Sequence, residues 1–104
     1  MADLDELRKL IANKSYLFTA HASSRAAERG IRSYEIEEAI VICRLVEDYP
    51  NHETSPRCLI LGYTKNGRPL HIVVTYPPAI KVITIYQPNP DEWSDDFMIR
   101  KSHE

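Results

Sequence analysis

Glycine and cysteine are both scarce in this sequence of 104 residues. It has three glycines, and they form no Gly-rich run, so no glycine-rich phosphate-binding loop is expected. Its two cysteines, Cys43 and Cys58, form no CxxC pair and fall in different predicted elements. The sequence therefore predicts no disulfide framework, and it favours a reduced, cytoplasmic setting.

Long apolar runs and metal-ligand motifs are also missing. No apolar run approaches the roughly 20 residues that a membrane helix needs, and the opening stretch MADLDELRKL has no apolar segment typical of a signal peptide. The four histidines show no HxxxH spacing, and no cysteine pair accompanies them. We therefore expect no membrane contact, no metal and no cofactor. The content of 43% hydrophobic and 27% charged residues predicts one folded domain over residues 1–104.

Charge is nearly balanced overall but is unevenly distributed. The net charge of −2 argues against a protein whose whole surface binds nucleic acid, although it allows a local basic cleft. The segment from Leu7 to Arg32 holds six lysines and arginines against one acid, Glu28. Acidic residues gather instead near the N-terminus, at residues 35–38 and at residues 91–96. This segregation indicates a polar functional face.

The first half of the chain predicts three helices. Each has a capping residue before it, and these residues are Asp3, Thr19 and Ser33. The second helix covers residues 20–29, and Gly30 ends it as the residue that tolerates a left-handed backbone. The stretch SYLF before it is either a short strand or an extended link. The third helix has a buried stripe of regular helical spacing made by Ile36, Ala39, Ile40 and Cys43.

The second half predicts strands. Four stretches have strand character, and these are RLVEDY, RCLILGYT, PLHIVVTY and IKVITIY. Asn66-Gly67 is a hairpin turn signal between the second and third of them. Asn89 would cap a short C-terminal helix, from which Trp93 and Phe97 would pin the segment onto the sheet. The predicted fold class is α+β, with N-terminal helices packed on one face of an antiparallel sheet of about four strands.

A basic stripe on the second predicted helix is the first candidate site. His21, Arg25 and Arg29 are four residues apart, so they lie on one side of a helix. Arginine offers a fixed fork of donors for phosphate, and histidine gives or takes a proton near neutral pH. The alternative is a solvent-exposed face whose arginines pair with the acids at residues 35–38, and spacing alone favours this alternative.

His71, in the strand PLHIVVTY, is the second candidate. A histidine in an apolar strand is most often a buried, hydrogen-bonded residue. Whether His71 meets Tyr86 of the next strand depends on the hairpin register. In one register His71 lies opposite Ile85 and Tyr86 points to the other face. A slip of one residue places His71 opposite Thr84, with Tyr86 on the same face, and the sequence leaves both open.

Three stretches together resemble a known family. FTAHASSRAAERGI, CLILGYTKNGRPLHIVVTY and ITIYQPNPDEW, with a late RK, are similar to family number 4258 of the domains of unknown function. This bacterial family is grouped with the RelE-like and barnase-like ribonuclease toxins. The resemblance covers about Tyr16 to Lys101, and Ala26 departs from it, since a larger apolar residue is expected there. It implies the RelE/barnase-like α+β fold, a metal-independent endoribonuclease, RNA as substrate and an antitoxin protein as partner. The candidate residues carried over by position are His21, Arg25, Arg29, His71, Tyr86 and Arg100.

The chemistry implied is in-line attack of a ribose 2′-hydroxyl on the adjacent phosphate. It needs a base, an acid and cations for the charge on phosphorus. The hypothesis assigns His71 or His21 to base and acid, Arg25 and Arg29 to the phosphate, and Tyr86 to orientation or proton donation. Arg100 would also bind phosphate. Two alternatives use the same fold without catalysis: a module that binds RNA, phosphate or a protein, and a structural partner without a ligand. An unpaired edge strand would also allow a homodimer.

Overall fold

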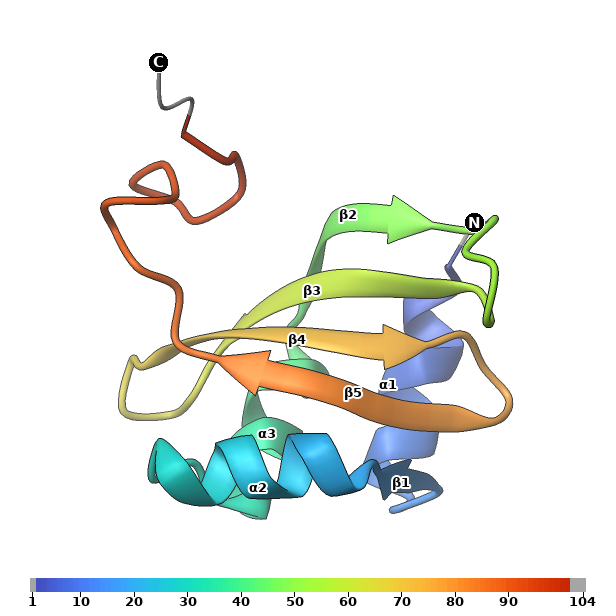
Figure 1. The fold of residues 1–104 in the computed structure, drawn as a ribbon. Coiled ribbons are helices and arrows are strands. Elements are labelled where there is room, and N and C mark those ends of the chain that lie inside the picture. Colours follow the sequence, from blue (N-terminus) through green and yellow to red (C-terminus); the bar gives the residue numbers. More distant parts are fainter. Residues whose placement is uncertain (1, 102–104) are drawn as a thin grey trace.

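In the computed structural model, which describes residues 2–101, the chain forms three helices and five strands (Figure 1). Within these residues no helix is both long enough and apolar enough to cross a membrane. The elements in chain order are α1 (Leu4–Ala12), β1 (Tyr16–Phe18), α2 (Ala20–Glu28), α3 (Ser33–Val41), β2 (Arg44–Tyr49), β3 (Arg57–Tyr63), β4 (Pro69–Thr75) and β5 (Ile80–Tyr86).

All five strands belong to one sheet with the order β1-β5-β4-β3-β2. The strands β2 to β5 are the four predicted ones, and each pairs antiparallel with the next. The fifth strand is the stretch SYLF, since β1 pairs parallel with β5 and places Tyr16 opposite Ile80. The α+β class is confirmed, whereas the expected number of about four strands is one too low. A strand of three residues has too short a pattern to be separated from a link by sequence.

The helix caps follow the prediction in two of three cases. The side chain of Asp3 accepts a hydrogen bond from the N–H of Glu6, and that of Thr19 accepts one from the N–H of Ala22. Gly30 has a φ of 64° and ends α2, as expected. The third cap is wrong by one residue.

Ser33 is the first residue of α3, and Arg32 precedes it as the capping residue. The backbone N–H of Arg32 donates to the Glu35 carboxylate over 3.0 Å, which is the reverse half of a capping box. The buried stripe predicted for this helix is confirmed, because Ile36, Ala39, Ile40 and Cys43 are all buried.

The main core lies between the helices and one face of the sheet. Figure 1 shows α1 and α3 behind the sheet and α2 along β5, which it contacts extensively. Alternation along each strand turns every second side chain toward the helices. The strand residues in this core are Cys58, Ile60, Leu70, Ile72, Val74, Ile80, Val82 and Ile85.

The opposite face of the sheet is partly covered by the segment after β5. Leu59, Leu61, His71 and Trp93 are all buried, yet they lie outside the main core. The rings of Trp93 and His71 meet edge to face, with centroids 4.4 Å apart. The chain therefore has a second, smaller buried layer, and residues 87–101 supply its cover.

The short C-terminal helix predicted after Asn89 does not form within residues 87–101. The carbonyl of Asn89 accepts from the N–H groups of Glu92 and Trp93, which makes a single turn. The segment then pairs with itself, because the N–H of Ser94 bonds the carbonyl of Ile99 and that of Lys101 bonds the carbonyl of Glu92. These pairings take the backbone groups that a helix would need. Trp93 packs onto the sheet as expected, but from a looped segment.

The backbone of α3 lies very close to the sheet at Gly62. A Cβ at this position would lie 2.0 Å from the carbonyl oxygen of Ala39. We predict that Gly62→Ala lowers the free energy of unfolding by about 3 kcal/mol, because α3 must move away from β3. The matched control is Gly30→Ala, which meets no atom within 4 Å but keeps a positive φ. It should cost only about 1 kcal/mol. Urea unfolding measures both, and equal losses would contradict the close-packing explanation.

Candidate functional site

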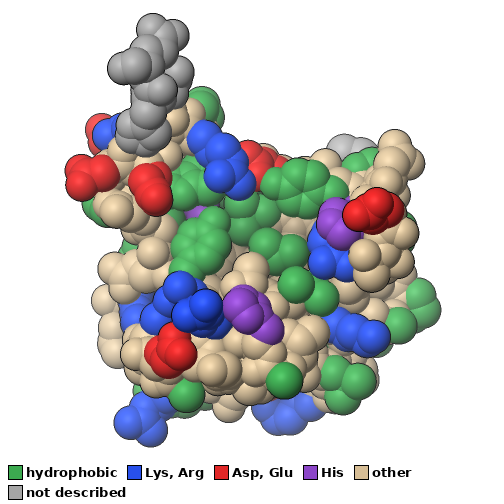
Figure 2. Space-filling model, viewed as in Figure 1, with side chains coloured by type: hydrophobic (Ala, Val, Ile, Leu, Met, Phe, Trp, Pro, Cys, Tyr) green, Lys and Arg blue, Asp and Glu red, His purple; other side chains and the backbone are tan. Residues whose placement is uncertain are grey.

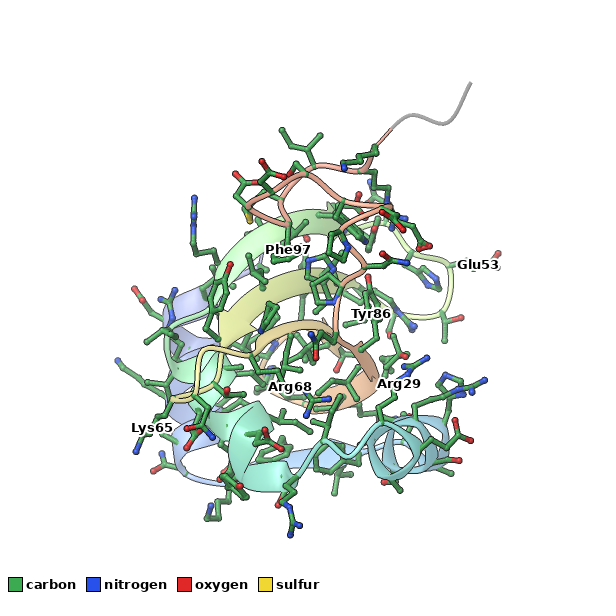
Figure 3. All side chains as sticks on the ribbon, turned by 90° about the vertical axis from the view of Figure 1, so that its left-hand side faces the viewer. Arg29, Glu53, Lys65, Arg68, Tyr86 and Phe97 are labelled. Carbon is green, nitrogen blue, oxygen red and sulfur yellow. The ribbon has the colours of Figure 1, made fainter. Side chains whose placement is uncertain are left out.

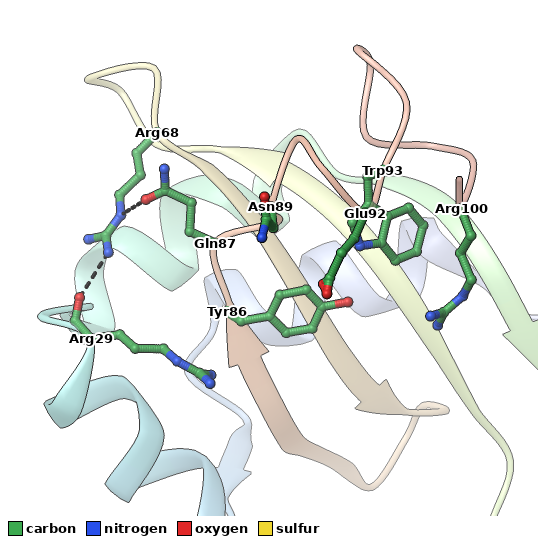
Figure 4. Close-up of a pocket in the computed structure, with 8 residues that line it drawn as sticks. All are labelled: Arg29, Arg68, Tyr86, Gln87, Asn89, Glu92, Trp93 and Arg100. Atoms are coloured by element: carbon green, nitrogen blue, oxygen red, sulfur yellow. Dashed lines mark hydrogen bonds between the residues drawn. The ribbon is translucent and has the colours of Figure 1, made fainter. Parts of the chain in front are cut away.

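A pocket of about 580 Å³ lies at the end of the sheet where β5 stops (Figure 4). Three separate parts of the chain build it: the end of α2, the start of β4, and the end of β5 with the segment that follows. Its lining residues are Arg29, Arg68, Tyr86, Gln87, Asn89, Glu92, Trp93 and Arg100. Figure 2 shows hydrophobic side chains in a hollow of the sheet face, with lysine and arginine side chains at its margins. Three arginines in one hollow make an anion the expected ligand.

Arg29 lies just beyond α2 and is held by the sheet. Its guanidinium donates to the backbone carbonyl of Ile85 over 2.7 Å. In Figure 4 its side chain extends toward Tyr86. A carbonyl takes one donor and neutralises no charge, and no acid pairs with this side chain among residues 2–101. Arg29 therefore contributes a full positive charge and spare donors to the pocket.

Arg100 lies on the other side of Tyr86 (Figure 4) and is held by a carboxylate. Its Nε and one terminal nitrogen donate to the two oxygens of Glu47 over 2.9 and 3.0 Å. The guanidinium also lies 4.7 Å from the ring centroid of Trp93. These bonds hold the pKa of Glu47 below its ordinary value, so the pair is ionised at neutral pH. Because 62% of the Arg100 side chain is exposed and it lines the pocket, its guanidinium is accessible to a ligand.

Arg68 serves the framework of the pocket. It donates to the backbone carbonyls of Arg29 and Gly30, over 2.9 and 3.2 Å, and to the side-chain oxygen of Gln87 over 2.9 Å. Figure 3 shows Arg68, Arg29 and Tyr86 at the same end of the sheet. Arg68 also lies 3.7 Å from the Glu35 carboxylate. With three of its five N–H groups bonded in this way, Arg68 ties the end of α2 to the end of β5.

A bulge in β5 decides how His71 and Tyr86 meet. Val74 pairs with Val82, whereas Val73 pairs with Thr84, so the register shifts by one residue between them. As a result His71 lies directly opposite Tyr86. Both registers expected from the sequence are therefore wrong at this point, since they placed His71 opposite Ile85 or Thr84. The extra residue in β5 brings the two side chains onto the same face.

The hydrogen bonds of His71 define its protonation. Its Nε2 lies 2.8 Å from the backbone carbonyl of Phe97, which can only accept, so Nε2 carries the hydrogen. Burial lowers the pKa of His71, and the ring is neutral at pH 7. Its Nδ1 is then an acceptor, and the hydroxyl of Tyr86 donates to it over 3.0 Å. Burial also raises the pKa of Tyr86, which keeps its phenol protonated.

Of the residues predicted from the sequence, the structure brings four together. Arg29, Tyr86 and Arg100 line one pocket, and His71 lies behind Tyr86. His21 and Arg25 are exposed on α2 and line no part of this pocket. Arg25 precedes Arg29 by about one helical turn and His21 precedes it by about two. Along the helix axis they therefore lie roughly 6 and 12 Å from Arg29. Arg25 pairs with Glu28 over 3.0 Å.

Besides Trp93, which was expected only to pack on the sheet, sequence reasoning missed four of the lining residues: Arg68, Gln87, Asn89 and Glu92. Three of them belong to the stretch QPNPDEW directly after β5, where polar residues alternate with prolines. That alternation at the end of a strand is the signal that could have found them. Less in the sequence indicates that Arg68 belongs to the pocket, because most of its hydrogen-bond partners are backbone carbonyls, which no sequence pattern marks. Within residues 2–101, no group of three or more His, Cys, Asp or Glu side chains is placed to hold a metal ion.

Burial of neutral His71 predicts a pH dependence of stability. Since its folded pKa lies below the ordinary 6.5, the unfolded chain binds more protons between these two values. The free energy of unfolding should therefore be full above about pH 6.5 and decline as the pH falls toward the folded pKa. We predict that His71→Gln removes this decline, whereas His21→Gln at an exposed position keeps it. Urea unfolding at pH 7.5 and pH 5.5 measures it, and an equal decline in the wild type and His71→Gln would contradict the assignment.

Comparison with known proteins identifies one family. The sequence pattern described as "Domain of unknown function (DUF4258)" matches residues 18–87, which is more than half of the chain. The matched span includes α2, the hairpin strands and Tyr86, and it ends before Asn89, Glu92 and Arg100. No curated protein and no solved structure gives a significant match.

Proposed function

The chain belongs to the DUF4258 family, and from that premise we propose that it is a metal-independent endoribonuclease. The observation that carries the proposal is the hydrogen bond from Tyr86, in a pocket flanked by Arg29 and Arg100, to the buried and neutral His71. The resemblance to RelE-like ribonuclease toxins supports it and adds a bacterial source, a cytoplasmic setting and an antitoxin as partner. The proposed fold grouping is that of the RelE/barnase-like toxins.

The two available arginines bind the phosphate. They lie on either side of Tyr86 in Figure 4, so a phosphate above the phenol meets donors from both. Charge-assisted N–H···O bonds of this kind are about twice as strong as neutral ones. They also stabilise the extra negative charge that phosphorus carries in the transition state. Arg68 contributes by fixing the position of the Arg29 backbone.

Tyr86 and His71 carry the proton. The 2′-hydroxyl of the RNA gives its proton to the phenol oxygen of Tyr86, while Tyr86 passes its own proton to Nδ1 of His71. The 2′ oxygen bonds to phosphorus, the bond from phosphorus to the 5′ oxygen breaks, and the leaving oxygen takes a proton from water. The products are a 2′,3′-cyclic phosphate and a 5′-hydroxyl. His71 then returns its extra proton through Tyr86 to the solvent.

Two neighbours of His71 stabilise the positive charge that its ring carries after it accepts the proton. The hydrogen bond from Nε2 to the Phe97 carbonyl favours the charged ring, and so does the negative charge of Glu47, whereas the positive charge of Arg100 opposes it. Burial opposes it and keeps the ring neutral before the reaction. The imidazole therefore begins as an acceptor and has partners for both of its N–H groups when it is protonated.

The second candidate function is an RNA-binding or phosphate-binding module without catalysis. One observation favours it: His71 is completely buried, and both ring nitrogens already have partners within the protein. The hydrogen bond from His71 to the Phe97 carbonyl also holds the C-terminal segment on the sheet. This structural role is by itself a sufficient reason for a buried histidine at this position. The two candidates share the arginines and differ in whether Tyr86 transfers a proton.

The test is cleavage of a labelled mixed-sequence RNA by purified protein in EDTA. Wild type should cleave it and leave cyclic phosphate ends. Tyr86→Phe should lose roughly a hundred- to ten-thousand-fold in rate while keeping its RNA affinity, because only the proton carrier is removed. Arg29→Gln should weaken RNA binding by roughly tenfold or more. The matched control is Arg32→Gln, which removes an exposed arginine that does not line the pocket.

The outcomes separate the two candidates. Binding that depends on Arg29 without any cleavage supports the binding module and overturns the enzyme. Cleavage that Tyr86→Phe retains overturns the proton path through His71. If Arg29→Gln and Arg32→Gln weaken binding equally, the pocket is not the anion site.

A further inference from the structure

We propose that the chain forms a symmetric dimer through the outer side of α3, with the helices of the two copies packed antiparallel. The surface involved is the α3 patch, which consists of the exposed side chains of Tyr34, Val41, Ile42 and Tyr63 together with Glu38 and Lys65. The proposal is independent of the proposed function, because the α3 patch and the anion pocket share no lining residue. In Figure 3 Lys65 lies at the margin of the molecule, apart from Arg29 and Tyr86.

Exposed apolar side chains gather in one groove of the molecule. The groove, of about 560 Å³, lies between α3 and the end of β3 with the turn that follows. Within residues 2–101 six large hydrophobic side chains are exposed, and four of them line this groove, with exposed fractions from 37% to 59%. The other two are Leu17, on β1, and Ile99, in the segment after β5. Single exposed hydrophobic residues are ordinary, whereas a group of them around one hollow indicates an interaction surface.

The apolar residues of α3 lie on two sides of the helix. Ile36, Ala39 and Ile40 are buried toward the sheet, where Gly62 lets the backbones of α3 and β3 come close. Tyr34 and Val41, two turns apart, lie on the solvent side and are 53% and 50% exposed. A helix that is apolar on its outer side as well as on its core side is normally covered on both. Among the described residues the outer side of α3 has no cover.

The α3 patch also carries one acid and one base. The backbone N–H of Lys65 donates to the Glu38 carboxylate over 3.1 Å, so the two residues are neighbours. Neither the Glu38 carboxylate nor the Lys65 ammonium group makes an ion pair within residues 2–101. Glu37 is different, because Lys14 pairs with it over 2.8 Å. The patch is therefore neutral overall, which favours a partner that also presents one acid and one base over a strongly basic or acidic partner.

A two-fold axis near Glu38 makes the α3 patch complementary to itself. Glu38 lies between Tyr34 and Val41, which are roughly 10 Å apart along the helix. With two antiparallel copies of α3, the axis places Tyr34 of each copy against Val41 and Ile42 of the other. The same rotation brings Glu38 of each copy to Lys65 of the other, because these two residues are neighbours close to the axis. One symmetry operation therefore covers the apolar side chains and pairs both charges.

The edges of the sheet are less suited to joining two copies. The outer strands are β1, which has only three residues, and β2, whose register shifts between Leu45 and Glu47. Short edge strands and bulges are features that prevent a second sheet from pairing at an edge. A homodimer through an edge strand therefore has the weaker basis, and the α3 patch is the better interface.

The experiment is sedimentation equilibrium of the whole protein from low micromolar to near-millimolar concentration. The wild-type mass should rise with concentration toward twice the 12.0 kDa of one chain. Ile42→Lys should weaken dimerisation roughly tenfold or more, because it buries an unpaired charge in the interface. The matched control is Leu17→Lys, which replaces a similarly exposed hydrophobic residue outside the α3 patch and should leave the dimer unchanged.

Two charge reversals test the symmetry of the interface. Glu38→Lys and Lys65→Glu should each stay monomeric at concentrations where wild type dimerises, because each variant gives the two facing patches the same charge. An equimolar mixture of the two variants should dimerise again, since a patch with two positive charges then meets a patch with two negative charges. Circular dichroism checks that each variant is folded.

Each result decides the proposal. A wild type that stays monomeric over the whole range overturns it and leaves a different protein as the partner of the α3 patch. A dimer that Ile42→Lys retains, or that Leu17→Lys disrupts to the same extent, overturns the assignment to this surface. A mixture of the charge variants that stays monomeric overturns the two-fold arrangement. None of these variants changes a residue of the anion pocket, so RNA binding and cleavage test the proposed function separately.

Discussion

One buried imidazole, that of His71, joins the sheet to the segment that completes the pocket. His71 bonds Tyr86 on the neighbouring strand and the Phe97 carbonyl in the C-terminal segment. Five of the eight lining residues follow β5, so the pocket exists only while this segment stays on the sheet. The Trp93 ring packs on the same imidazole. The ion pair between Arg100 and Glu47 holds the C-terminal end of the segment against β2. A buried group whose hydrogen bonds are all made is costly to disrupt, so it orders the segment more firmly than apolar contact alone.

The two arginines that face a ligand differ in electrostatic role. Arg100 is paired with Glu47 and adds little net charge, although its guanidinium lines the pocket in a fixed orientation. Arg29 is held by a neutral carbonyl and keeps its whole charge. Attraction of an anion therefore depends mainly on Arg29, while Arg100 orients it. This division makes the proposed local anion site compatible with a net charge of −2.

Local features of the fold could be predicted from the sequence because they depend on near neighbours. The caps at Asp3 and Thr19, the end of α2 at Gly30 and the hairpin strands are decided within a few residues. The bulge in β5 is not decided locally, because it depends on how three strands pack, and it changed the partner of His71. The role of Arg68 was hidden for another reason. Its acceptors include two backbone carbonyls, and a carbonyl is present at every residue whatever its side chain.

The basic stripe of α2 shows how a correct local pattern can be only partly relevant to a site. Ala22 and Ala26 are buried, so the helix packs by its small residues and leaves His21, Arg25 and Arg29 outside. The stripe then runs along the edge of the sheet, and only its last member reaches the end of β5. His21 lies about two helical turns from Arg29 and does not line the pocket that contains Tyr86. In the proposed mechanism the reacting groups His71 and Tyr86 come from the sheet, while Arg29 at the end of α2 and Arg100 in the segment after β5 bind the phosphate.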